Sequence, residues 1–260
     1  MSPGSSAAPR EFSASTVLRS LLFPTAFAVA FVVFVWNEAA REALLQLLFP
    51  GRFSYIYERV SLAHLFAEHV ALVAISSALA ALVGITLGVF VTRPIGRDFQ
   101  PIVQDMSSVA QTFPPVAVLA LAVPAIGFGF APSIVALFVY SILPILNNTI
   151  SGLDSVDPAV VEASRGVGMK RYQTLLLTEL PLAARVIAAG VRTSVVINVG
   201  TATVGAVVGA GGLGTIIVSG LVRDNAAYVF SGAITAAFLA LSLDFVIGRV
   251  QARFYDARTS

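Results

Sequence analysis

The chain has 260 residues, of which 57% are hydrophobic and only 12% are charged. Its mean hydropathy is +0.87, whereas soluble domains carry roughly 25% charged residues. These values exclude an ordinary soluble globule and predict an all-α integral membrane protein. The net charge of +2 gives no sign of a nucleic-acid surface, and the absence of cysteine excludes disulfides and thiolate chemistry.

In chain order, residues 1–16 are rich in Ser, Ala and Pro, and we expect them to be a disordered, cytoplasmic segment. Residues 17–250 form the predicted membrane domain, and residues 251–260 a cytoplasmic tail. Because about 20 apolar residues span a bilayer, we expect about six transmembrane helices. They cover roughly residues 17–36, 70–91, 103–123, 131–150, 186–209 and 228–248.

Two of these spans are weakly defined. The third contains Pro114 and Pro115, which should break or kink it. The fifth carries Arg192 near its start and Asn198 in its middle. Between the first two spans, the aromatic residues of the semi-polar segment 37–68 favour an interfacial helix over a docking surface.

The distribution of basic residues predicts the orientation. With the N-terminus inside, eleven Lys and Arg residues fall in the inner segments and four in the outer ones. Inner segments of membrane proteins carry the excess of Lys and Arg. We therefore expect a multi-pass protein of a bacterial inner membrane, with both termini and the segment 157–181 in the cytoplasm.

Residues 157–181 form a polar island between apolar segments. Asp157 can cap a helix that starts at Pro158, and Gly168 allows a sharp turn before a second short helix that ends at Leu180-Pro181. Val160, Ala163 and Val167 fall on one face of the first helix. A small apolar face of this kind suits a groove on another protein. The alternative is an amphipathic loop on anionic lipid.

The order of residues in this island resembles a known motif. Glu162-Ala163-Ser164, three residues, Gly168, nine residues and Thr178-x-Leu180-Pro181 are similar to the EAA loop of ATP-binding-cassette (ABC) importer permeases. Ser164 stands where that pattern has Ala, and Thr178 where it has Ile. The resemblance implies a type I importer permease (MetI-like) fold, whose coupling helix binds an ATPase subunit. The implied coupling residues are Asp157, Glu162, Ala163, Ser164, Gly168, Leu180 and Pro181.

Further phrases resemble one branch of these permeases, the osmoprotectant importers for glycine betaine, choline and carnitine. They are the segment 111–117, Asn147-Asn148-Thr149, and the stretch from Asn198 through Thr201-Ala202-Thr203 to Gly214. With them the resemblance covers about residues 70–248. It implies import of a quaternary-ammonium osmolyte, and a permease of the same class for methionine or another small solute is the alternative.

Gly209, Gly211 and Gly214 also satisfy the formula G-x-G-x-x-G. A dinucleotide site needs those glycines after a strand, in a strand–helix–strand unit. Here they follow an apolar helix. We therefore expect close helix packing, or non-helical backbone that lines a cavity.

Polar residues at membrane depth are the usual markers of a transport pathway. The pathway candidates are Gln111, Thr112, Tyr140, Asn198, Thr201 and Thr203. The alternative for each is a hydrogen bond between helices. Asp105 and Asp244 are interpreted as snorkelling or paired charges. A metal site at His64 and His69 is improbable, because five residues separate them on a helix.

The sequence contains no Walker-type loop and no catalytic constellation, so we expect no enzyme activity and no cofactor on this chain. The resemblance implies that ATP and Mg²⁺ bind partner ATPase subunits. It also implies an extracytoplasmic solute-binding protein and a second permease chain, identical or related. A secondary carrier that uses Asp105, Arg192 and Asp244 for ion coupling is the rival class.

Overall fold

A computed structural model describes residues 14–259. Every regular element in that range is helical, which confirms the all-α prediction. The elements are α1 (Ala14–Trp36), α2 (Glu38–Leu48), α3 (Leu62–Val91), η1 (Arg97–Phe99), α4 (Gln100–Thr112), α5 (Pro115–Ile126), α6 (Phe130–Asp154), α7 (Pro158–Gly166), α8 (Arg171–Thr174), η2 (Leu175–Glu179), α9 (Leu180–Ala202), η3 (Thr203–Val208), α10 (Leu213–Val222) and α11 (Ala226–Thr259).

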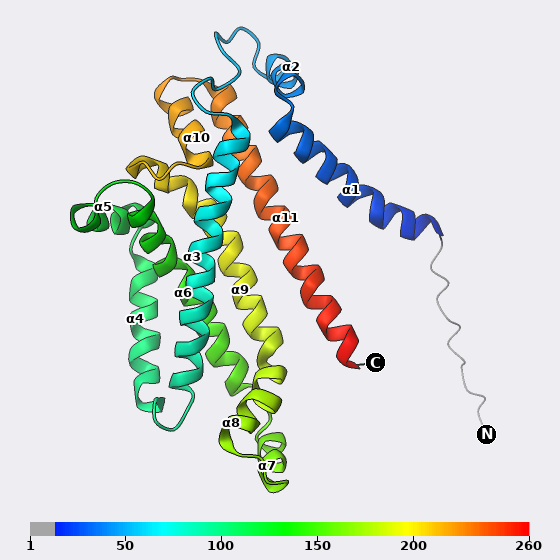
Figure 1. Cartoon of the computed structure of the whole chain (residues 1–260), viewed down its shortest axis with the longest axis vertical. Helices are drawn as coiled ribbons and strands as arrows, with labels where there is room; N and C mark the ends of the chain where they lie inside the picture. Colours follow the sequence, from blue (N-terminus) through cyan, green and yellow to red (C-terminus); the bar gives the residue numbers. More distant parts are fainter. Residues whose placement is uncertain (1–13, 260) are drawn as a thin grey trace.

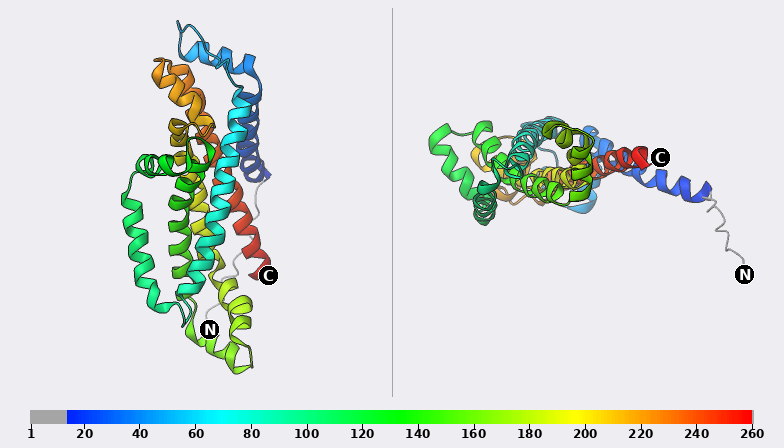
Figure 2. Two further views of the ribbon diagram at one scale, coloured as in Figure 1. Left: turned by 60° about the vertical axis from the view of Figure 1, so that its left-hand side comes forward. Right: turned by 90° about the horizontal axis from the view of Figure 1, so that it is seen from below.

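The centre of the molecule is the bundle of α3, α6 and α9, with α11 packed beside α9 and α10 (Figure 1). The short helices α7 and α8 project from one end of the bundle, and α2 and α10 lie at the other (Figure 2). Residues 1–13 of the predicted disordered segment lie outside the described residues. The predicted tail from residue 251 continues α11 as far as Thr259.

The predicted number of about six spans is not confirmed. In the described part of the chain, four helices are long and apolar enough to cross a membrane, in the segments Leu62–Val91, Phe130–Asp154, Arg171–Val208 and Ala226–Arg253. A fifth results if α4 and α5 together count as one bent span. Thr25–Trp36 and α10 are shorter apolar helices. The sequence analysis left residues 210–227 between the fifth and sixth expected spans, and the structure places α10 there.

The expected break in the third span is confirmed. The helices on either side of Pro114 are bent by 98° relative to each other. Pro114 has extended backbone, with φ −62° and ψ 140°, and Pro115 starts α5. A proline disfavours the helical conformation of the residue before it, so two consecutive prolines end α4 and redirect the chain. As a result α5 crosses the bundle instead of continuing along it (Figure 2).

Small residues allow the three central helices to approach closely. A Cβ atom added to Gly88 of α3 would lie 2.6 Å from the Thr149 side chain of α6. One added to Gly190 of α9 would lie 2.5 Å from Asn148, also of α6. Lipid tails are as apolar as the helices, so close van der Waals packing at small residues provides much of the association between membrane helices.

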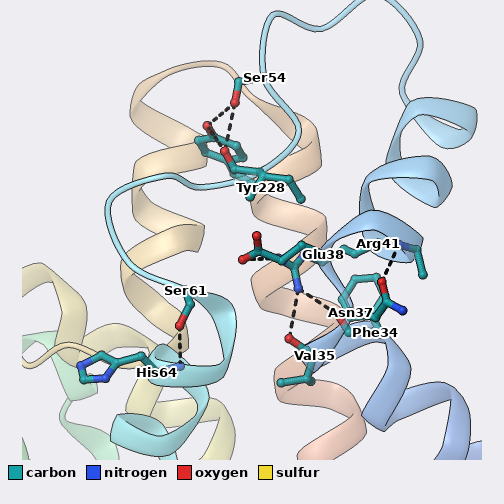
Figure 3. A network of polar contacts seen from close by, with 11 residues as sticks. Phe34, Val35, Asn37, Glu38, Arg41, Ser54, Ser61, His64 and Tyr228 are labelled. Carbon is teal, nitrogen blue, oxygen red and sulfur yellow. Dashed lines mark hydrogen bonds and ion pairs between the residues drawn. The ribbon is translucent and has the colours of Figure 1, made fainter.

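At the α2–α10 end, polar contacts fix the connection between α1 and α2 (Figure 3). The buried Arg41 donates hydrogen bonds to the carbonyl oxygens of Phe34 and Val35, 3.0 and 3.1 Å away, at the end of α1. Those carbonyls have no partner within α1, since they belong to its last turn. Burial lowers the pKa of Arg41, and nearby Glu38 opposes that shift. Ser54 and Tyr228 join the following loop to α11.

Candidate functional site

The polar segment 157–181 folds as two helical arms joined by a tight turn. The Asp157 side chain caps α7 by accepting a hydrogen bond of 2.8 Å from the Ala159 N–H, and Pro158 is the first residue of the helix. Both features follow from local sequence, since Asp favours the N-cap and Pro the first helical position. The predicted start of the first arm is confirmed.

The turn between the arms depends on Gly168, which has a φ of +90°. Its N–H donates to the Arg165 carbonyl, and the Met169 N–H donates to the Ser164 carbonyl. These bonds satisfy two carbonyl groups of the last turn of α7. A side chain at residue 168 would be strained, because L-residues rarely adopt this backbone conformation. The expected sharp turn at Gly168 is confirmed.

The second arm differs from its prediction. It does not end at Leu180-Pro181, because α8, the π-helical turn η2 and α9 follow one another without a break. Pro181 has no N–H to donate, and its ring would clash with the Leu177 carbonyl in a regular α-helix. The wider turn at Leu175–Glu179 lies directly before this proline and accommodates it. The arm therefore continues into the membrane helix α9 as one body.

The two positions that depart from the EAA pattern contact each other. The Oγ atom of Ser164 lies 3.0 Å from the Oγ1 atom of Thr178, across the two arms. Ser164 also donates to the Val160 carbonyl at 2.9 Å, and the Thr178 hydroxyl lies 3.9 Å from the Met169 sulfur. A polar contact thus joins the two positions that depart from the pattern.

Apolar side chains of both arms are exposed at this end of the molecule. Val160 is 41% exposed and Val167 is 79% exposed, and Ala163 lies between them. Tyr172, Leu176 and Leu177 on the second arm are more than half exposed. Glu162 is exposed as well. The arrangement presents an apolar surface with a charge beside it, and an apolar face of this kind is what a helix places in a groove of another protein.

An ion pair holds the second arm against α3. The Nη1 atom of Arg93 lies 2.5 Å from the Oε2 atom of Glu179, and the side chains are 26% and 8% exposed. Between α7 and the end of α3 lies an open cavity of about 940 Å³, whose charged lining includes Arg97, Asp154 and Arg165. Sequence reasoning missed this pair, because no periodicity or cap connects a residue after α3 with a residue before α9.

The glycine-rich turn lies at the other end of α3. Gly209, Gly211 and Gly212 all have positive φ angles, between 71° and 82°. The Gly212 N–H donates to the Glu68 carboxylate at 2.8 Å, and a Cβ atom on Gly211 would lie 2.5 Å from the same carboxylate. The turn is non-helical backbone between η3 and α10, with no strand before it.

The structure does not gather the pathway candidates into one site. Asn198 is buried and donates to the hydroxyls of Ser76 and Ser77 on α3, at 2.7 and 3.0 Å. Tyr140 donates to the Phe113 carbonyl at the bend between α4 and α5. Thr112, Thr201 and Thr203 each donate to a carbonyl of the preceding turn. Gln111 lies on α4, and its side chain is outside the described part.

The charges at membrane depth are paired in part. Arg192 of α9 forms a bidentate ion pair with Asp244 of α11, with both N···O distances at 2.6 Å. This confirms the interpretation of Asp244 as a paired charge. Asp105 lies on the exposed side of α4, at the wall of an apolar groove. The Nε2 atom of His69 faces the Val199 carbonyl at 3.0 Å, and His64 pairs with Glu68.

Comparison with known proteins assigns the family. Residues 84–256 match the family described as the binding-protein-dependent transport system inner membrane component. The chain belongs to this family. It is 37% identical over 235 residues to the osmoprotectant import permease protein OsmY of Salmonella typhimurium, covering 89% of this chain and 93% of that protein. It is 38% identical to the choline transport system permease protein OpuBB of Bacillus subtilis, covering 73% and 87%.

Solved structures show the same fold. The methionine ABC transporter MetNI in an inward-facing conformation has a chain that matches with a TM-score of 0.65 and 24% identity, covering 72% of this chain and 93% of that one. A chain of a bacterial alginate ABC transporter matches with a TM-score of 0.55 and 17% identity, covering 92% and 94%. This family membership and this fold confirm the resemblance to ABC importer permeases.

Proposed function

We propose that this chain is the transmembrane subunit of an ATP-driven, binding-protein-dependent importer that moves a quaternary-ammonium osmolyte into the cell by alternating access. The observation that carries the proposal is the two-armed loop 157–181, which presents exposed apolar residues beside Glu162 and continues without a break into α9. The proposed cargo rests on relatives whose names state osmoprotectant and choline transport.

The proposed partners follow from the same loop. Two ATPase subunits bind ATP and Mg²⁺, and each receives one loop in a surface groove, with Asp157, Glu162, Ala163, Ser164, Gly168, Leu180 and Pro181 shaping the contact. One chain is too small to enclose a pathway, so a second permease chain, identical or related, completes it. An extracytoplasmic solute-binding protein selects the cargo and delivers it.

The orientation in the proposal places the α7–α8 end in the cytoplasm of a bacterium and the α2–α10 end outside. Arg93, Arg97, Arg165, Lys170 and Arg171 gather at or beside the first end. At the opposite end, α2 and the loops mix Arg41, Arg52, Arg59 and Arg223 with acidic residues. An excess of basic residues in short loops marks the cytoplasmic side, and Arg253 near the end of α11 agrees with a cytoplasmic C-terminus.

A methionine permease is the second candidate, because the MetNI chain shares the fold. A fold hosts many functions, whereas the closer sequence matches carry osmolyte names, so we favour an osmolyte. The neutralising Arg192–Asp244 pair also disfavours an ion-coupled carrier, since both groups are already compensated.

The test is copurification from native membranes in mild detergent, followed by uptake in proteoliposomes that contain every retained subunit. We expect an ATPase and a solute-binding protein in the eluate. Choline, glycine betaine or carnitine should enter only when ATP is present on the side of the membrane that carries the ATPase. Excess methionine should not compete for uptake. A chain that purifies alone and transports without ATP would overturn the proposal in favour of a secondary carrier.

A further inference from the structure

The Arg93–Glu179 ion pair joins two segments that are far apart in the sequence. Arg93 lies two residues after the end of α3, and Glu179 is the last residue of the π-helical turn η2. Their N···O distance is 2.5 Å. Neither residue is among those that the EAA resemblance assigns to coupling, so the pair adds a contact that the motif does not include.

The surroundings of Glu179 show that the pair is not an incidental surface contact. Its side chain is only 8% exposed, and the next residue, Leu180, packs against an apolar cluster of Leu153, Ala183 and Ile187. A carboxylate in such a place is destabilising unless a charge compensates it. Arg93 supplies that charge, so replacement of either partner alone leaves a poorly solvated charge or donor.

The other end of α3 makes a second polar contact, with the glycine-rich turn. Glu68 accepts a hydrogen bond of 2.8 Å from the Gly212 N–H of the glycine-rich turn. The helix α3 runs unbroken between the two contacts, and its rise of 1.5 Å per residue separates them by roughly 35 Å. One rigid helix thus touches the loop at one end and the glycine-rich turn at the other.

We propose that Arg93 and Glu179 are positioning residues that make the loop and α3 move as one unit. A displacement of the loop by an ATPase then reaches the glycine-rich turn through α3 and its contact with Glu68. This inference rests on the proposed function, because it assumes that an ATPase displaces the loop. The ion pair that connects the loop to α3 thus lies outside the docking surface.

The experiment measures ATP hydrolysed and solute imported by the complete transporter in proteoliposomes. In Arg93→Gln and Glu179→Gln, hydrolysis should persist while import per ATP falls by about fivefold or more, in the usual range of coupling between sites. The double variant should lose no more than either single one, since each removes the same contact. Arg93→Lys retains the charge and should keep at least about half of the import.

Arg97→Gln is the matched control, because Arg97 is an exposed arginine on the same connection and lines the same cavity. It should leave import per ATP unchanged. If the single variants fail to assemble, the double variant decides, since it buries no unpaired charge. A proportional fall of hydrolysis and import would reduce the pair to a structural role and overturn the inference. Loss of ATP-dependent import in the unmodified transporter would instead overturn the proposed function.

Discussion

The loop 157–181 leads into α9, and the glycine-rich turn 209–212 follows η3 beyond its other end, yet different forces shape the two segments. The loop is fixed by its own residues, through the Asp157 cap and the positive φ of Gly168, and its apolar face is exposed. The turn is fixed by contacts from elsewhere, chiefly Glu68 and His69 of α3. A segment whose conformation is fixed by its own residues can keep that conformation while it docks on a partner. A segment held by contacts with α3 can instead change when α3 moves.

The largest expected effect on stability is at Gly214, two residues after the glycine-rich turn, and a glycine of the loop serves for comparison. A Cβ atom at Gly214, the first turn of α10, would lie 2.0 Å from the Thr203 carbonyl oxygen, so the backbone must move. We expect Gly214→Ala to reduce the free energy of unfolding by about 3 kcal/mol, the upper range for overpacking. Thermal unfolding of the detergent-solubilised complex measures the change.

Gly166 is the matched control for that substitution. It ends α7 in the loop, and no atom lies within 4 Å of an added Cβ. Gly166→Ala should be neutral, or stabilising by about 0.5 kcal/mol through the reduced entropy of the unfolded chain. Equal destabilisation by both variants would show that the two regions are packed alike, and would contradict the contrast between a tightly packed Gly214 and an open Gly166.

A second substitution tests the turn of the docking loop itself. Gly168 has a φ of +90° and open space around it, so a side chain there causes backbone strain without a collision. The strain of about 1–2 kcal/mol would lower the fraction of molecules whose loop has the docking-competent conformation by about tenfold. We expect Gly168→Asp to insert normally into the membrane and to lose most ATP-driven uptake, while ATP hydrolysis continues. Unchanged uptake would remove Gly168 from the coupling element.

A third test asks whether Ser164 and Thr178 act together. Ser164→Ala leaves the half-buried Thr178 hydroxyl without its partner and should cost about 1 kcal/mol of stability. Thr178→Ile alone should cost a similar amount. The double variant restores an apolar contact across the arms and should be near neutral. Additive losses in this double-mutant cycle would mean that the two positions are independent.

The same contrast between local and distant contacts explains which features of the structure the sequence predicts. The Asp157 cap, the Gly168 turn and the break at Pro114 depend on residues next to them, and all three were predictable. The path of the second arm was not, because Pro181 suggested a stop. In the structure a π-helical turn absorbs the proline, and packing of Leu175 and Leu180 against Leu153, Ala183 and Ile187 sustains the helix.

The contacts of α3 lie beyond the reach of single-sequence reasoning. Glu68 and Gly212 are 144 positions apart, and Arg93 and Glu179 belong to different segments. No periodicity or cap connects such residues. Asn198 is a similar case, since its polar side chain indicated a pathway while the structure directs it to Ser76 and Ser77. Composition and motifs predict the class and the docking loop, and packing decides which polar groups meet.

The smallest expected effect concerns the rim of the docking surface. Glu162 is exposed, so Glu162→Lys should change the stability of the isolated chain by less than about 0.5 kcal/mol. A partner that meets this carboxylate with a basic group would bind about threefold more weakly, since exposed charge pairs contribute only 0.2–1 kcal/mol. Quantitative copurification of the ATPase at increasing salt measures the loss. Glu58→Lys reverses the charge of another exposed glutamate at the other end of the molecule and should retain the ATPase fully. Equal retention by the two variants would place Glu162 outside the interface, and the exposed apolar residues Val160 and Val167 would then remain as its principal contacts.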